Sequence, residues 1–212
     1  GLLAQAGKLV DASFVDVPRQ RNTRAENATI KAGGVPETWA ATPAKQSQKD
    51  VAARWTKKNA AVHYGYKNHV KADAQSKLIE GYAVTDASVH DSQKLAELVA
   101  TADGTVYADS AYRSAEAEAM LAQKQVTSQI HERAYPNRPL TEEQKESNRQ
   151  KSKIRARIEQ VFGCMSQSMK GFYLRYIGRR RNAGAIGLIN LIYNLARYEQ
   201  IVRLKLLPRN AA

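Results

Sequence analysis

Three acidic residues stand where a carboxylate could take part in chemistry. Asp109 directly follows the apolar run Val106–Ala108, as a residue does when it ends a strand. Asp11 interrupts the strand-forming segment Lys8–Val17, and Glu159 lies in a late segment with helical periodicity. A carboxylate at the end of a strand is held rigidly and stays accessible, which suits binding and catalysis.

Each acid also has a purely structural interpretation. Asp109 could begin a turn or cap the following helix. Asp11 could face solvent at the edge of a sheet, because a buried charge is costly unless it is paired or binds a cation. Glu159 could pair with Arg155, which stands four residues earlier on the same helix. The residues taken singly leave both interpretations open.

The charge balance indicates a polyanionic partner. The 212 residues include 33 Lys or Arg against 20 Asp or Glu, a formal net charge of +13. Nucleic acid is the simplest such partner, and an anionic membrane surface is the other option. The longest apolar stretch, Ala183–Ala196, is shorter than the roughly 20 residues that a membrane-spanning helix needs.

The single cysteine, Cys164, excludes an intramolecular disulfide and a cysteine-based zinc site. It fits a reducing compartment. The first ten residues lack the pattern of a secretory signal. We therefore expect a cytoplasmic protein.

Hydrophobic patterning predicts a mixed α/β fold. Two strands around the turn 73–77 form an antiparallel hairpin, and further strands alternate with helices. The expected strands are 8–17, 63–70, 78–85, 105–108 and 126–130; the expected helices are 91–101, 115–122, one that starts at Thr141 with a capping box, and Ile186–Leu204. This mixture predicts a mixed sheet flanked by helices, with a helical C-terminal third.

The segment 18–60 separates the first strand from the hairpin. It has no sustained periodicity, and its residues 18–59 include nine Lys or Arg against three acids. We interpret it as a long, mobile, basic loop that could order on nucleic acid; a solvated insertion is the alternative. The expected organisation is a core of residues 1–17 and 61–170, this insertion, and a basic segment with a C-terminal helix, 171–212, that packs on the core.

The late helix and the residues after it are strongly basic. Between Arg149 and Arg181 there are ten Lys or Arg and one acid, Glu159. Aromatic residues alternate with basic ones at 170–176, which suits stacking on bases and contacts with phosphates. The candidate DNA-binding residues are Lys151, Lys153, Arg155, Lys170, Arg175, Arg179, Arg180 and Arg181.

The three acids and the basic surface together fit phosphodiester chemistry. Two divalent ions about 3.5–4 Å apart can activate an attacking hydroxyl and stabilise the departing oxygen. Mg²⁺ prefers oxygen ligands, and carboxylates with substrate phosphates supply them. Asp11, Asp109 and Glu159 are therefore the candidate catalytic and metal-binding residues.

These motifs resemble a known family. The chain contains V-D-A-S-F-V-D, W-T-K-K, H-Y-G-Y-K-N-H-V, V-H-D-S-Q, Y-A-D-S-A-Y-R and R-A-R-I-E-Q-V-F-G in this order. It is similar from about Lys8 to Tyr198 to the catalytic domain of bacterial insertion-sequence DDE transposases, of the group named after insertion sequence five. The resemblance implies a ribonuclease-H-like fold with the acidic triad on Asp11, Asp109 and Glu159.

The same resemblance implies a reaction and its partners. These are metal-dependent cleavage of transposon ends and strand transfer into target DNA, two Mg²⁺ ions that Mn²⁺ can replace, double-stranded DNA, and a homodimer assembled on that DNA. It also suggests that His90 and Asp91 lie near the metal site; a turn His beside a helix-capping Asp is the alternative.

The chain departs from the family pattern in two places. The family often has a Lys seven residues after the Glu, where this chain has Ser166, and Lys170 is the nearest candidate. Family members also usually carry an N-terminal helical region, whereas here ten residues precede Asp11. A truncated relative that only binds DNA, and a basic RNA-associated protein, are the alternative functions.

Overall fold

The computed structural model describes residues 7–58, 60–136 and 138–206, and in this part of the chain six strands form one mixed sheet. β1 (Lys8–Asp16) lies centrally, antiparallel to β3 (Ala61–Asp73) and parallel to β5 (Thr105–Ala108), which is itself parallel to β6 (Thr127–Ile130). β2 (Arg54–Lys58) and β4 (Ile79–Asp86) pair antiparallel with successive stretches of β3. The predicted hairpin is β3–β4.

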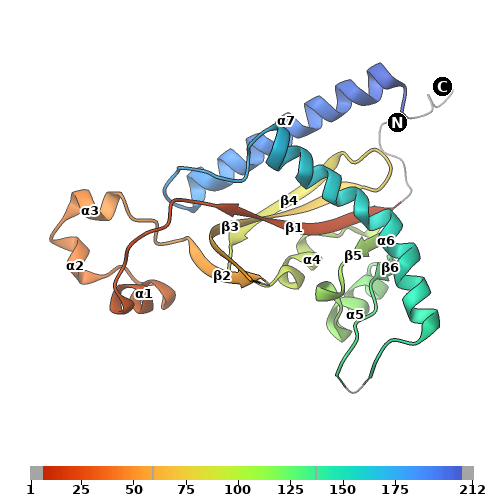
Figure 1. Cartoon of the computed structure of the whole chain (residues 1–212), viewed down its shortest axis with the longest axis horizontal. Coiled ribbons are helices and arrows are strands. Elements are labelled where there is room, and N and C mark those ends of the chain that lie inside the picture. The colour runs from red at the N-terminus through yellow and green to blue at the C-terminus, as the bar shows by residue number, and fades with distance from the viewer. Residues whose placement is uncertain (1–6, 59, 137, 207–212) are drawn as a thin grey trace.

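Helices cover both faces of the sheet (Figure 1). Successive strand residues point to opposite faces. Val10 accordingly packs with α4 (Leu95–Leu98) and α5 (Ala115–Gln123), whereas Leu9 packs with α6 (Glu142–Gly163) and α7 (Arg179–Leu204). This is the predicted mixed sheet flanked by helices, and it is of the ribonuclease-H-like class.

The long helix α6 is specified by its ends and its apolar stripe. The Thr141 hydroxyl accepts from the Gln144 amide, and the Gln144 side chain accepts from the Thr141 amide, which is the predicted capping box. Ile158, Val161 and Met165 are fully buried against the sheet. A π-helical turn, η4 (Cys164–Ser168), follows directly after the regular helix.

The segment 18–60 is a correction to the prediction, because it contains regular structure. It holds three short helices, α1 (Arg24–Lys31), α2 (Glu37–Ala40) and α3 (Pro43–Ser47), and its end is β2. β2, which lies within this segment, pairs with β3 and so belongs to the sheet. Figure 1 shows the three helices projecting beside the sheet.

Asp50 ties this segment to the body of the protein. Its buried carboxylate accepts from the Tyr66 hydroxyl of β3 at 2.8 Å and from the Gly178 amide, just before α7, at 3.0 Å. The amides of Ala52 and Ala53 also donate to it. These donors satisfy a buried carboxylate without a cation, and they fix the segment to two core elements.

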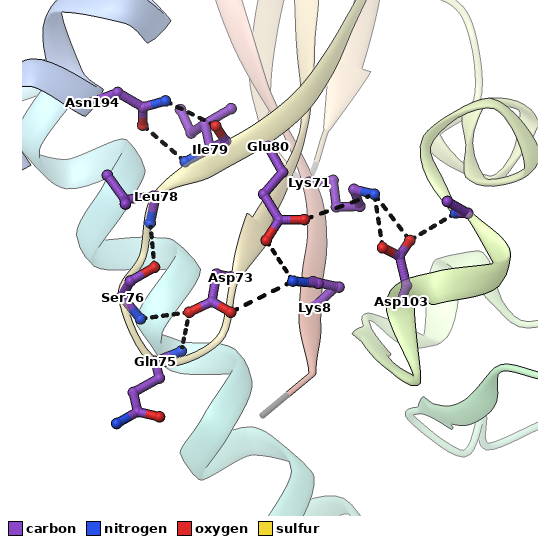
Figure 2. Close-up of polar contacts among 11 residues, drawn as sticks. Lys8, Lys71, Asp73, Gln75, Ser76, Leu78, Ile79, Glu80, Asp103 and Asn194 are labelled. Atoms are coloured by element: carbon purple, nitrogen blue, oxygen red, sulfur yellow. Dashed lines mark hydrogen bonds and ion pairs between the residues drawn. The ribbon is translucent and has the colours of Figure 1, made fainter. Parts of the chain in front are cut away.

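The start of β1 carries a buried network of charges (Figure 2). The Lys71 ammonium lies 2.9 Å from the Asp103 carboxylate and 3.9 Å from that of Glu80. Lys8 donates to Glu80 and lies 3.5 Å from Asp73. The network joins β1, β3 and β4 to the 3₁₀ turn η2 (Thr101–Asp103).

Two predicted helices differ from those observed. The segment 91–101 is not one helix: it comprises the 3₁₀ turn η1 (Asp91–Lys94), α4, and the beginning of η2. α7 begins at Arg179, seven residues before the predicted start, so Arg179–Arg181 form its first turn. Over the described residues, no helix combines the length and apolarity needed to cross a bilayer.

Candidate active site

Strand pairing brings Asp11 and Asp109 together. β1 and β5 are parallel, with Lys8 opposite Val106 and Leu9 opposite Tyr107. The same offset sets Asp11 opposite Asp109, which directly follows β5. Neighbouring strands lie about 4.8 Å apart. Because both residues alternate in phase with Leu9 and Tyr107, both carboxylates belong to the face that α6 covers.

Arg155 connects this pair of strands to Glu159. Its guanidinium donates to the Asp11 carboxylate at 3.0 Å and to the Glu159 carboxylate at 3.1 Å. α6 packs its apolar stripe on the sheet, so residues on the neighbouring stripe reach the sheet surface. The structural alternative for Glu159, pairing with Arg155, is therefore observed. The same guanidinium also links the helix to the strand acid Asp11.

The surroundings of Asp11 disfavour the ionised form of its carboxyl group. Burial raises its pKa above the ordinary value of 3.8, and nearby Asp109 acts in the same direction. The Ala12 amide, Arg155 and Lys58 oppose this shift without cancelling it. A carboxyl that remains costly to ionise beside an arginine is a place where an additional cation would be favourable.

Asp109 is held by its own turn. Its side chain accepts from the Ser110 amide at 2.5 Å and caps the 3₁₀ turn η3 (Ser110–Tyr112). The capping interpretation and the proximity to Asp11 are both realised. The turn fixes the carboxylate while β5 fixes the backbone.

The sequence analysis did not single out Tyr112 or His131. Tyr112 is fully buried, its hydroxyl has no partner in the described residues, and burial, then Asp11 and nearby acids, raise its pKa well above the ordinary value. His131 follows β6, and its Nε2 lies 3.1 Å from the Ser152 hydroxyl. Burial and then Arg155 lower its pKa. The sequence feature that could have pointed to them is that each lies shortly after the end of an expected strand.

The observed roles of His90 and Asp91 differ from the alternative in which Asp91 caps a helix beside a turn His. His90 caps η1, accepting from the Ser92 amide, whereas Asp91 pairs with Lys67 at 2.8 Å. η1 packs on η3, next to Asp109. Asp91 therefore lies near the candidate site, and its negative charge is already neutralised by Lys67.

The eight predicted DNA-binding residues divide into two groups. Lys151 and Arg155 are partly buried and engaged: Lys151 donates to the Ile130 carbonyl at 3.1 Å, and Arg155 holds the acids. The other six are exposed, namely Lys153, Lys170, Arg175, Arg179, Arg180 and Arg181. Arg179 also donates to the Val84 carbonyl at 3.0 Å.

The carboxylates supply the oxygen donors that Mg²⁺ or Mn²⁺ prefers. Within the described residues, however, no three acidic, His or Cys side chains are grouped closely enough to hold a metal ion. The cause is visible in Arg155, which lies between Asp11 and Glu159, while the Glu159 side chain is 63% exposed. The chemistry of the three carboxylates fits divalent ions, whereas the pairing of Glu159 with Arg155 keeps it from joining Asp11 and Asp109 in the described structure.

Comparison with known proteins decides the family. A family model described as the transposase DDE domain matches residues 5–195. The chain belongs to this family. A relative, the transposase for insertion sequence element IS1106 of Neisseria meningitidis serogroup B, is 39% identical over 132 residues, which are 61% of this chain and 46% of the relative. The match therefore spans less than half of that transposase, and the predicted resemblance to bacterial insertion-sequence DDE transposases is confirmed.

Proposed function

We propose that this DDE-family chain cleaves DNA at transposon ends and transfers the resulting 3′ end into target DNA. The observation that supports this is the convergence of Asp11 and Asp109 on adjacent parallel strands, with Glu159 linked to them through Arg155. Asp11, Asp109 and Glu159 would hold two Mg²⁺ ions, or Mn²⁺ in their place. When bound, such ions activate the attacking hydroxyl and stabilise the departing oxygen.

The chain's own residues prepare this site. β1 and β5 hold two carboxylates side by side, and α6 carries the third on a largely exposed side chain that pairs with Arg155. Arg155 neutralises Asp11 and Glu159 while it is bonded to both. Once Glu159 leaves it, the guanidinium can bind a DNA phosphate. The exposed basic residues on α6, before α7 and in the first turn of α7 would hold the DNA backbone.

The test is metal-dependent nicking of supercoiled plasmid DNA. We expect the parent to nick with Mn²⁺ or Mg²⁺ and not with excess chelator. Asp109→Asn and Glu159→Gln should each lower the rate on the order of 100-fold or more, as expected for groups that act on developing charge. Binding to a DNA duplex, measured by fluorescence anisotropy, should change little.

Glu146→Gln is the matched control, because Glu146 is an exposed acid on the same helix, away from the candidate site. It should nick at the parental rate. A second readout is the melting temperature: Mn²⁺ should raise that of the parent and not that of Asp109→Asn, since a ligand stabilises only the state that binds it. Parental nicking by Asp109→Asn would refute the assignment.

A second candidate function is DNA binding without catalysis. Arg155 favours it, because its guanidinium already neutralises two of the acids. This reading predicts salt-dependent DNA binding by a parent chain that shows neither nicking nor a melting-temperature shift with Mn²⁺.

A further inference from the structure

The helix α7 buries one face against the protein and exposes large apolar side chains on the opposite face. One face packs on the protein through buried Ile186, Asn190 and Tyr193. Gly187 lets this helix lie directly against the Tyr82 ring of β4, and Asn194 bonds the Ile79 backbone at 2.8 Å, as Figure 2 shows. The packing on the core that was predicted for this helix therefore uses one face only.

The opposite face exposes a continuous line of large apolar side chains. Leu188 and Leu195 are each 60% exposed, and Val202 is 56% exposed. We define the α7 stripe as Gly184, Leu188, Leu191, Leu195, Tyr198 and Val202. Ile192, also exposed, adjoins it. An exposed apolar stripe of this length commonly marks a surface that contacts a partner.

The spacing of the α7 stripe specifies the kind of partner. Its residues follow one another at four, three, four, three and four positions, as read from the sequence. This is the seven-residue repeat of a seam that packs against another helix. Gly184 is exposed, and a Cβ there would meet nothing within 4 Å, so a partner helix could approach closely.

The pattern is almost symmetric about Leu195. Leu188 and Val202 lie seven residues on either side of it, and Leu191 and Tyr198 lie four and three residues away. Two copies in antiparallel orientation would therefore set leucine, tyrosine and valine opposite one another. A two-fold contact requires this kind of self-complementary surface.

Charge favours the antiparallel orientation. Arg179–Arg181 form the first turn of α7. In a parallel pair the two arginine clusters would lie about 10 Å apart, close to one Debye length, and would repel. In an antiparallel pair centred on Leu195 they lie about 45 Å apart along the axis. Glu199, which borders the stripe, is neutralised within its own helix by Arg203 at 2.6 Å.

The available area is sufficient for a weak dimer. The exposed fractions of the five large stripe residues and Ile192 amount to about three whole side chains, or on the order of 550 Å² per copy. Two copies would bury about 1,100 Å², near the lower limit for a specific interface. We propose that the α7 stripe joins two copies of this chain as an antiparallel helix pair centred on Leu195.

Sedimentation equilibrium without DNA or metal tests this proposal independently of the proposed catalysis. The parent should show a monomer–dimer equilibrium at tens of micromolar, and Leu195→Glu should be monomeric. Leu204→Glu is the matched control, because Leu204 is also exposed and lies on the same helix about 180° away from Leu195. Helix content and melting temperature would verify that both variants fold.

Disulfide trapping tests the orientation, in a Cys164→Ser background. Leu195→Cys alone should form a covalent dimer. A mixture of Leu188→Cys and Val202→Cys chains should cross-link, whereas Leu188→Cys alone should not. A parent that stays monomeric at 100 micromolar, a Leu195→Glu variant that still dimerises, or a parallel cross-linking pattern would each overturn the proposal.

Discussion

At the scale of single residues, the candidate site depends on a carboxyl that the fold makes costly to ionise. Burial raises the pKa of Asp11 above its ordinary value of 3.8, and its contact with Arg155 does not fully compensate. Between the ordinary and the raised pKa, the folded protein binds more protons than the unfolded chain. Its free energy of unfolding therefore falls as pH rises through this window, and the penalty remains at neutral pH.

Asp11→Asn removes the ionisation and keeps a polar side chain of similar size. We expect its free energy of unfolding at pH 7 to exceed that of the parent, with the difference shrinking as pH falls through this window and disappearing below pH 3.8. Urea denaturation at pH 7, 5 and 3.5 measures this. Glu97→Gln, at an exposed acid, should have little effect at any of these values. A less stable Asp11→Asn at pH 7 would show that the ion pair with Arg155 outweighs the cost of burial.

At the scale of elements, the start of the central strand is fixed by buried ion pairs rather than by apolar packing alone. Lys71 of β3 holds Asp103 at 2.9 and 3.0 Å, and the Asp103 carboxylate also accepts from the Ala100 amide at 2.7 Å. Breaking a buried pair leaves an uncompensated charge, which costs more than the pair contributes.

Lys71→Met should therefore lower the free energy of unfolding by about 3–5 kcal/mol. Adding Asp103→Asn should recover part of the loss, because the amide oxygen can still accept from Ala100. Lys94→Met is the control: Lys94 pairs with exposed Glu97 at 2.7 Å, and such surface pairs contribute about 1 kcal/mol or less. Urea titration gives all three values, and equal effects of Lys71→Met and Lys94→Met would contradict the role of burial.

Local patterns in the sequence predicted the elements that carry the acids. The apolar run before Asp109 specified β5, and the helical periodicity around Glu159 specified α6, because burial on one side of each element leaves a periodic trace. The parallel register that aligns Asp11 with Asp109 joins residues far apart in the chain, so no local pattern contains it. Their proximity had to be argued from shared chemistry.

Other features escaped prediction for identifiable reasons. α1–α3 are short, and their segment is tied to the core by individual contacts, such as the buried carboxylate of Asp50 and the bond from Arg54 to the Ile30 carbonyl, which leave no periodic signal. Arg155 was recognised as a possible partner of Glu159, but its second contact, with Asp11, depends on the tertiary fold. For α7 the apolar composition indicated burial, although many of its large apolar side chains are exposed.

At the scale of the whole molecule, the excess of positive charge is spread unevenly. The formal net charge is +13, and many surface cations are balanced by neighbouring acids, such as Lys94 by Glu97 and Lys145 by Glu142. No carboxylate lies within salt-bridge distance of Arg179, Arg180 or Arg181 in the described residues. This cluster can therefore contact phosphates without first breaking an ion pair.

The salt dependence of DNA binding can show whether the DNA is held by the arginine cluster at the start of α7 or by the total charge of the protein. Each phosphate contact contributes about 0.9 to the slope of log K against log salt concentration. Replacing Arg179, Arg180 and Arg181 by Gln should reduce the slope by up to about 2.7. Replacing Lys94, Lys145 and Arg149 by Gln removes the same charge from cations that already have acidic partners, so the slope should change by less than about 1. Anisotropy titrations of a DNA duplex between about 50 and 200 mM salt, over which phosphate contacts cause a large change in affinity, give both slopes. An equal reduction in the two triple variants would mean that total charge, and not the arginine cluster at the start of α7, holds the DNA.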